Sequence, residues 1–316
     1  MRFIGLLLFS VFLLTINSFP QGCSDAGFCT MGAMKPDQHF SKKINLKLRS
    51  MEVSFYRGTT TLTPIVYSAT ADLNFSLNSK NTFQVKLPYQ WVEGRLASTQ
   101  GFGDISLCFT RNLISKEGLD LNFSLGGKIP TNNSNKTVRD ETLNKDLPLP
   151  MYYQTSLGTY DAIAGLSLIN RKWLFATGIQ VPFNQNKNQF LWGKWTGSSE
   201  DQAYILKYSK AKELKRGIDV MLRIERNFRF SRLNFSIGLL PIYRVRKDEI
   251  TDPLGNRVKP DGTTGLALSG IVTAGYSFNV RTGVKFLLGR KITQRDENPD
   301  GLTRLFVSTV TYFYRF

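Results

Sequence analysis

Long stretches of this sequence alternate apolar and polar residues one by one, and this alternation limits the fold more than any other feature. In the clearest case, Val220 and Leu222 share one parity while Asp219 and Arg223 occupy the other. A helix would scatter such charges around its surface, whereas a strand separates an apolar face from a charged one. The pattern runs through 218–230 and recurs at 72–77, 83–91 and 119–129. The sequence therefore predicts an all-β protein.

The pattern predicts twelve strands. Many of them have at least the length of about 9–11 residues that a tilted strand needs to cross a bilayer. The expected strands lie near 43–56, 65–78, 82–92, 103–113, 118–130, 157–169, 172–184, 215–229, 231–246, 264–279, 281–291 and 303–316.

The connections between these segments alternate between very short and long. Every second connection is a turn of a few residues, while the others run through 131–156, 185–214, 247–263 and 292–302. Short turns at one end and long loops at the other are typical of outer-membrane barrels. We therefore predict, over 43–316, a single up-and-down antiparallel transmembrane β-barrel of about 12 strands, with short periplasmic turns and longer extracellular loops. A soluble barrel with its apolar face turned inward has the same alternation, so the choice depends on the termini and the loops.

The N-terminus predicts export. Arg2 precedes an apolar run over 3–16 and a short polar stretch, which is the pattern of a secretory signal peptide over 1–22. The run is too short for a transmembrane helix, which needs about 20 residues. Residues 23–42 are expected to form an N-terminal periplasmic segment or a plug in the lumen. Cys23 and Cys29 form a disulfide in one interpretation, and Cys23 is lipidated in the other.

The last strand ends on alternating aromatic residues. Tyr312, Tyr314 and Phe316 share a parity, and the chain ends on the last of them. Such an ending is similar to the assembly signal of bacterial outer-membrane barrels, so we expect the barrel-assembly machinery to bind it. An ordinary C-terminal strand is the alternative.

The charge balance excludes several classes of function. Lys and Arg number 41 against 24 Asp and Glu, for a net charge of +17. Nucleic-acid binding would need a basic stripe on a recognisable module, and no such module is present. We expect the basic turns and loops to contact outer-membrane lipid and lipopolysaccharide. With His39 as the single histidine, the sequence suggests no catalytic triad, metal site or cofactor.

In a membrane barrel the polar parity faces the lumen, so charged residues inside long strands become candidate lumen-lining residues. Mixed signs on neighbouring strands favour a salt-bridged interior over a selective ring of charge. The candidates are Asp104, Asp120, Lys128, Asp219, Arg223, Glu225, Arg229, Arg244 and Arg246.

Several short motifs resemble a known family. Residues 82–89 (TFQVKLPY) followed by 101–107 (GFGDISL) resemble the paired motif of the MetA-pathway phenol-degradation family of outer-membrane barrels. Residues 126–131 are similar to its following strand end, and 239–244 and 299–304 resemble the version found in Bacteroidota envelope proteins. The resemblance spans most of 43–316. It implies a transporter for small hydrophobic or aromatic molecules and assigns no binding residue.

Three functions remain open at this point. The first is an outer-membrane channel for small solutes, by passive or facilitated diffusion through the lumen. The second is a structural or docking barrel that partners a secretion or surface-assembly complex through its long loops. The third is a phospholipase-like enzyme, which would need His and Ser together on one strand, whereas His39 precedes the first strand. We expect a channel and no enzyme.

Overall fold

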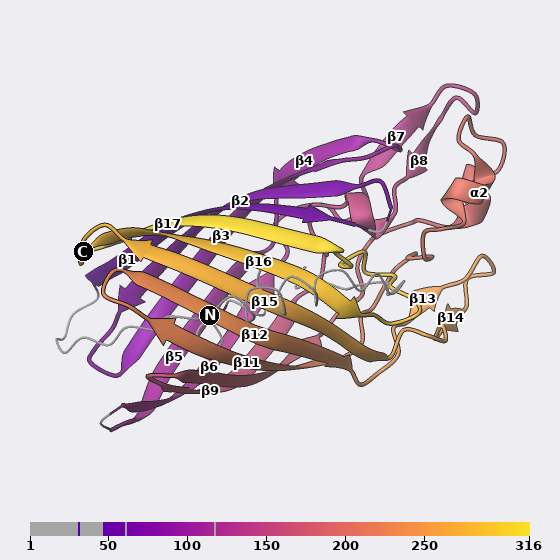
Figure 1. Cartoon of the computed structure of the whole chain (residues 1–316). Coiled ribbons are helices and arrows are strands. Elements are labelled where there is room, and N and C mark those ends of the chain that lie inside the picture. Colours follow the sequence, from indigo (N-terminus) through magenta and orange to yellow (C-terminus); the bar gives the residue numbers. More distant parts are fainter. Residues whose placement is uncertain (1–30, 32–46, 61, 117) are drawn as a thin grey trace, which may run out of the picture.

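The computed structural model describes residue 31 and residues 47–60, 62–116 and 118–316. Over these residues the chain forms an antiparallel barrel of twelve strands (Figure 1). The barrel strands are β1 (Lys47–Thr59), β2 (Ile65–Ser76), β3 (Asn81–Glu93), β5 (Ile105–Lys116), β6 (Leu119–Ile129), β9 (Asp161–Asn170), β10 (Trp173–Pro182), β11 (Asp219–Arg229), β12 (Leu233–Arg244), β15 (Gly265–Ser277), β16 (Thr282–Thr293) and β17 (Phe306–Arg315).

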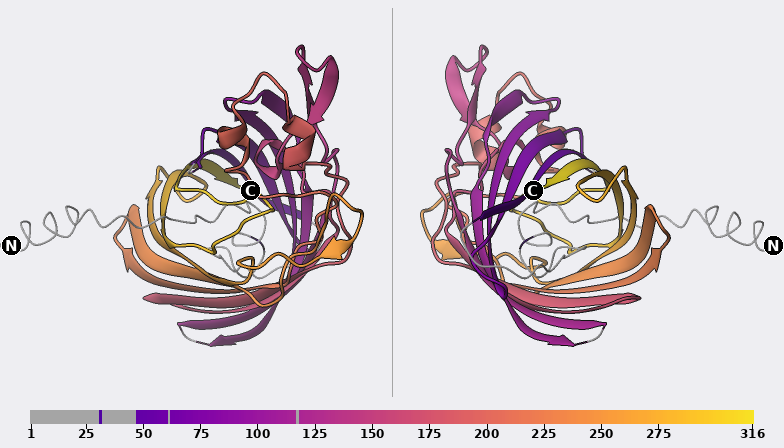
Figure 2. Two further views of the ribbon diagram at one scale, coloured as in Figure 1. Left: turned by 90° about the vertical axis from the view of Figure 1, so that its right-hand side faces the viewer. Right: turned by 90° about the vertical axis from the view of Figure 1, so that its left-hand side faces the viewer.

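Pairing of the first strand with the last closes the barrel. The β1–β17 register runs from Ser50 opposite Arg315 to Thr59 opposite Phe306. Every other strand pairs with its neighbours in chain order, and the views along the axis show the resulting ring (Figure 2). The predicted fold class and strand number are confirmed.

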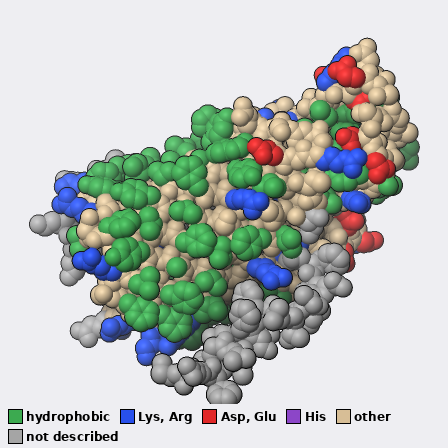
Figure 3. Space-filling view, turned by 45° about the horizontal axis from the view of Figure 1, so that its top comes forward, with side chains coloured by type: hydrophobic (Ala, Val, Ile, Leu, Met, Phe, Trp, Pro, Cys, Tyr) green, Lys and Arg blue, Asp and Glu red, His purple; other side chains and the backbone are tan. Residues whose placement is uncertain are grey.

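The two faces of the wall differ as the alternation requires. On β11, Leu222 is 40% exposed on the outer face while Arg223 is 1% exposed on the inner face. Hydrophobic side chains gather over the outside of the strands (Figure 3). Lys and Arg cluster at the end opposite the long loops, and a few more lie further along this face. A bilayer offers the backbone no water, so a sheet that spans it must close on itself and present an apolar outside.

One strand is longer than predicted and is interrupted. The segment expected at 103–113 consists of β4 (Ser98–Phe102) and β5, and both pair with β3. Between them, the N–H of Gly103 donates to the carbonyl of Pro88 over 2.9 Å. Gly101 has φ +152°, a conformation that residues with a side chain rarely adopt. The two glycines therefore bend the wall at this point.

The long loops carry structure that the alternation did not reveal. They contain the strands β7 (Thr137–Asp140), β8 (Lys145–Pro148), β13 (Ile250–Thr251) and β14 (Arg257–Val258), the 3-10 helices η4 (Met151–Tyr153) and η5 (Trp192–Trp195), and the helix α2 (Gln202–Ile205).

An aromatic cluster holds part of these loops together as a crown at one side of the rim (Figure 1). Tyr153, Phe190, Trp195 and Tyr208 are fully buried in it. The hydroxyls of Tyr204 and Tyr208 lie 2.8 Å apart, so their polar ends are satisfied. Burial raises the pKa of Tyr152, at the edge of this cluster, to about 12. No helix among the described residues is long and apolar enough to cross a bilayer.

The predicted signal peptide and the Cys23–Cys29 disulfide lie outside the described residues. Met31 is the one described residue of 23–42, and it is buried against Cys108, Ile163 and Met221, which project from β5, β9 and β11.

Candidate functional site: the barrel interior

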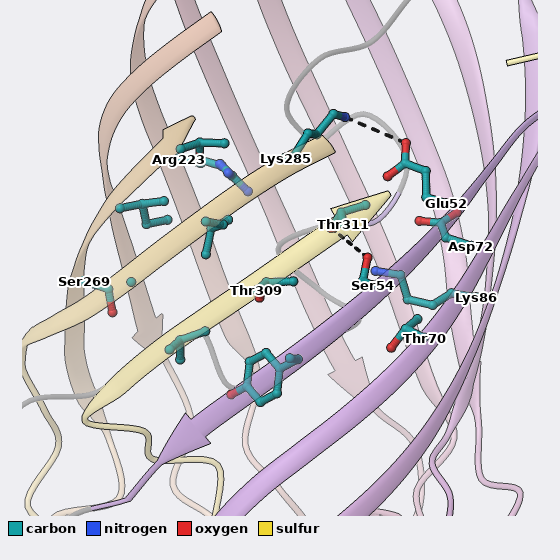
Figure 4. A pocket seen from close by; sticks show the side chains of 16 residues that line it. Glu52, Ser54, Thr70, Asp72, Lys86, Arg223, Ser269, Lys285, Thr309 and Thr311 are labelled. Atoms are coloured by element: carbon teal, nitrogen blue, oxygen red, sulfur yellow. Dashed lines mark hydrogen bonds and ion pairs between the residues drawn. The ribbon is translucent and has the colours of Figure 1, made fainter. Parts of the chain in front are cut away.

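A cavity of about 130 Å³ lies inside the barrel, against β1–β3, β11 and β15–β17 (Figure 4). Hydroxyl groups make up much of its wall, and the oxygens of Ser54 and Thr311 lie 2.8 Å apart across neighbouring strands. Lys285 Nζ lies 3.8 Å from Glu52 Oε1 at one side. Ile271, Leu287 and Val307 add apolar surface. A wall of this kind accepts an apolar body together with a few hydrogen-bonding groups.

A second cavity of about 50 Å³ lies next to the first, towards the long loops. Both cavities are lined by Tyr56 and Lys86, so these two side chains lie where the cavities meet. Residues 154–157, Gly301, Leu302 and Arg304 line the second cavity from the loop side. The second cavity therefore lies in the extracellular half of the interior.

A buried cluster of charges fills the interior near this end. Arg244 donates to both oxygens of Asp219 at 2.7 Å, to Asp248 at 2.9 Å and to Asp300 at 2.8 Å. All four residues are buried. Asp248 and Asp300 come from extracellular loops, so Arg244 ties these loops to the β11–β12 wall. Below, the Arg244 cluster means these four residues and Arg295, which lies 3.5 Å from Asp300.

The pKa values of the two loop carboxyls in this cluster, Asp248 and Asp300, shift in opposite directions. Burial raises the pKa of Asp248, and Arg244 offsets this only in part. Burial also acts on Asp300, but the nearby guanidinium groups of Arg244, Arg295 and Arg216 outweigh it and hold the pKa of Asp300 well below its usual range. The guanidinium groups therefore hold Asp300 in its ionised form within the cluster.

Two further ion pairs lie on the inner wall. Arg216 pairs with Asp161, which also accepts a hydrogen bond from Gln180. Arg223 pairs with Glu225, whose other oxygen accepts from the hydroxyl of Ser236 at 3.1 Å. These pairs satisfy charges that would be costly to bury alone.

The structure places the predicted lumen-lining residues in three settings. Arg223, Glu225, Asp219 and Arg244 are brought together in the pairs above. Asp104 and Lys128 are buried and line the second cavity, where Asp104 accepts from the hydroxyl of Ser156 and from the N–H of Leu157 at 3.1 Å.

The other three predicted residues lie at strand ends. Asp120 and Arg229 line an open recess of about 610 Å³ beside the short turns. Arg246 is exposed and lies two residues beyond β12. The predicted assembly residues lie at the end of β17, where the rings of Tyr314 and Phe316 are 4.8 Å apart.

Several site residues were not predicted: Glu52, Asp161, Arg216, Asp248, Lys285, Arg295 and Asp300. Most of them stand in loops or at the first residue of a strand, where alternation gives no signal. Glu52 and Lys285 had a usable signal, because each occupies the polar parity within its strand. Among the described residues, no group of three or more His, Cys, Asp or Glu could hold a metal ion.

Comparison with solved structures finds the same barrel elsewhere. The COG4313 outer membrane channel from Pseudomonas putida F1 superposes with a TM-score of 0.56 at 15% identity, covering 89% of this chain and 99% of that one. The CymD monoaromatic hydrocarbon channel (TM-score 0.41, 11% identity, 96% and 99% covered) and the NanC porin (0.42, 7%, 85% and 98%) are more distant. No family model and no curated protein matches the sequence.

The closed wall, its apolar outside and this superposition define the class. The chain is a transmembrane β-barrel of the bacterial outer membrane, with the short turns on the periplasmic side and the long loops outside. At 15% identity the similarity concerns the fold, so the solute has to be argued from the interior.

Proposed function

We propose that this barrel is an outer-membrane channel through which small molecules diffuse, passively or with facilitation by the wall. The observation that carries the proposal is the pair of adjoining interior cavities, which share Tyr56 and Lys86. A barrel of twelve strands is too wide for its own side chains to fill as an eight-stranded one does. The space left over is suited to a small solute.

We propose a small solute with an apolar or aromatic body. The apolar side chains Ile271, Leu287 and Val307 beside wall hydroxyls support this class, as does the resemblance to the phenol-degradation family. The charges next to the cavity are engaged with each other, as in the Arg223–Glu225 and Lys285–Glu52 pairs. Such a wall favours an uncharged solute over an ion.

We further propose that residues 23–42 act as a plug. Met31 supports this, because it is 1% exposed and packs on side chains from the inner wall. Gly126 makes room for it, since a side chain there would meet the Met31 methyl at 2.8 Å. We propose no enzymatic activity, and we propose outer-membrane lipid, lipopolysaccharide and the barrel-assembly machinery as partners.

Liposome swelling tests the channel. Liposomes that contain the purified protein are exposed to a graded series of uncharged solutes, with full-length protein, a variant lacking 23–42, and Met31→Asp. We expect swelling with the smallest solutes, and faster swelling and a higher size limit in both variants. A barrel that admits no solute, with or without 23–42, would contradict the channel.

The alternative is a structural or docking barrel. The crown and the Arg244 cluster favour it, because they build a firm platform at the extracellular end. Failure of all solutes to enter, together with correct folding, would support this alternative.

A further inference from the structure

One buried arginine of the interior has no carboxylate partner. Five arginines are buried among the residues that the structure describes: Arg216, Arg223, Arg244, Arg295 and Arg304. The first four each pair with an aspartate or a glutamate. Arg304 ends the 299–304 motif, is 6% exposed and makes no ion pair within the described part of the chain. Burying a cation without a counter-ion is costly, so such a residue favours binding of an anion.

The hydrogen bonds of Arg304 leave part of its guanidinium group without an acceptor. Nη1 donates to the carbonyls of Gly301 at 2.7 Å and Thr303 at 3.1 Å, which belong to the same loop. Nε is buried and makes no hydrogen bond. The two bonds of Nη1 hold the group in place, while the N–H of Nε is available to a further acceptor.

The hydroxyl of Tyr56 lies next to Arg304 and is also buried without a hydrogen bond. Tyr56 comes from β1, and Arg304 lies two residues before β17. Gly58 leaves the space in which the two side chains meet, because a side chain there would contact the Tyr56 hydroxyl and lie 2.9 Å from Arg304 Cδ. A phenol hydroxyl donates one hydrogen bond, so the two residues together offer two donors to one acceptor group.

Both residues line the second cavity, whose charges favour an anion. Besides Arg304, its described lining contains the cations Lys86 and Lys128 and one carboxylate, Asp104. Asp104 accepts a hydrogen bond from the hydroxyl of Ser156, so its negative charge is already held by a donor from the loop. Three cations against one carboxylate make the lining more favourable to an anion than to a cation.

The two cavities suit different parts of one molecule. The second cavity, of about 50 Å³, has room for a small polar group, while the first, of about 130 Å³, adds the apolar side chains Ile271, Leu287 and Val307. Tyr56 lines both cavities. A molecule whose charged end reaches Arg304 can therefore extend its body past the Tyr56 ring into the first cavity.

We propose that the second cavity binds a carboxylate, held by the Nε–H of Arg304 and the hydroxyl of Tyr56, and that the solute of the channel is a small apolar or aromatic carboxylic acid in its ionised form. This inference rests on the channel proposed above and names the head group of its solute. The preference of the first cavity for uncharged groups then applies to the body of the solute. The carboxylate takes the place of the counter-ion that the chain itself supplies to the other four buried arginines.

Binding of benzoate to the purified full-length protein in detergent tests the site. Isothermal titration calorimetry compares benzoate with benzamide, which has the same ring and a similar shape but no charge. Arg304→Met removes the guanidinium group and keeps an apolar side chain, and Tyr56→Phe removes only the hydroxyl. Arg290→Met is the matched control, because Arg290 is exposed on the neighbouring strand β16 and lines neither cavity.

We expect the unchanged protein to bind benzoate about tenfold more tightly than benzamide, as for a hydrogen bond to a charged group. Benzoate binding should weaken about tenfold in Arg304→Met and about fivefold in Tyr56→Phe, and should not change in Arg290→Met. Equal affinity for benzoate and benzamide would overturn the proposal. Benzoate binding that neither site variant weakens would overturn it as well. Mobility on gels reports folding, and Tyr56→Phe keeps the test open if Arg304→Met does not fold.

Liposome swelling with uncharged solutes separates this proposal from the channel itself. Swelling that persists in a protein with no preference for benzoate removes the carboxylate site and leaves the channel. Benzoate binding that depends on Arg304, in a barrel that admits no solute, would remove the channel and leave the site.

Discussion

The two halves of the barrel interior are built differently. The extracellular half is held by fully buried ions, with Arg244 bonded to three carboxylates and Arg216 paired with Asp161. The half nearer the short turns is lined largely by hydroxyls and apolar side chains, with a looser Glu52–Lys285 contact of 3.8 Å. The difference shows that three of the nine charges predicted from alternation, Asp104, Asp219 and Arg244, fasten loops to the wall. The first cavity is lined by hydroxyl and apolar side chains together with the charged residues Glu52, Asp72, Lys86, Arg223 and Lys285.

The largest effect is expected from breaking the Arg244 cluster. Arg244→Met leaves Asp219, Asp248 and Asp300 buried without their shared cation, and removing one partner of a buried ion pair costs about 3–5 kcal/mol. The free energy of unfolding in urea, followed by the mobility shift of the folded barrel on gels, measures this. Stability equal to that of the unchanged protein would show that the cluster does not hold the loops.

The cluster should also weaken in acid. Because nearby guanidinium groups hold the pKa of Asp300 below its usual value of 3.8, its ionised form stabilises the fold above about pH 4, and this contribution is lost as the pH falls towards the folded pKa. The raised pKa of Asp248 acts in the opposite direction. We expect Asp300→Asn to lower the thermal midpoint at pH 7 and to differ less from the unchanged protein at pH 2.5. A constant difference across this range would contradict the assignment.

Widening the junction between the halves should raise flow through the barrel. Tyr56→Ala removes a ring that lines both cavities, so we expect about twofold higher conductance. Tyr67→Ala is the control, because Tyr67 stacks on Trp91 at 6.4 Å, away from either cavity. Equal conductance in the Tyr56 variant would place the narrowest point elsewhere.

The smallest effect is expected from an ion pair outside both halves. Arg95 and Glu200 join at 3.0 Å on the exposed crown. Glu200→Gln should change the free energy of unfolding by less than about 1 kcal/mol, because water and salt screen such pairs. A loss as large as that of Arg244→Met would remove the contrast between buried and exposed charges.

The wall of the barrel could be predicted from the sequence, but the ion pairs and folded loops inside it could not. The parity of residues such as Val220 and Arg223 depends on the strand alone, so the strands, their number and the loop asymmetry could be predicted. The partnership of Arg244 with Asp248 and Asp300 depends on two loops folding back over the rim, which no local pattern encodes. The aromatic crown could not be predicted for the same reason, because Tyr153, Trp195 and Tyr208 belong to different loop segments and come together only in the folded protein.

Along each strand, residues of one parity are expected to face lipid and residues of the other to border a passage. Two adjacent residues of β17 test this expectation. Thr309 lines the first cavity, while Val310 is 49% exposed on the outer face. Single-channel recording in planar bilayers compares the unchanged protein with Thr309→Trp and Val310→Trp. The account predicts discrete conductance steps that Thr309→Trp reduces and Val310→Trp leaves unchanged. Bilayers that stay silent with the folded protein, or current blocked by Val310→Trp alone, would contradict it.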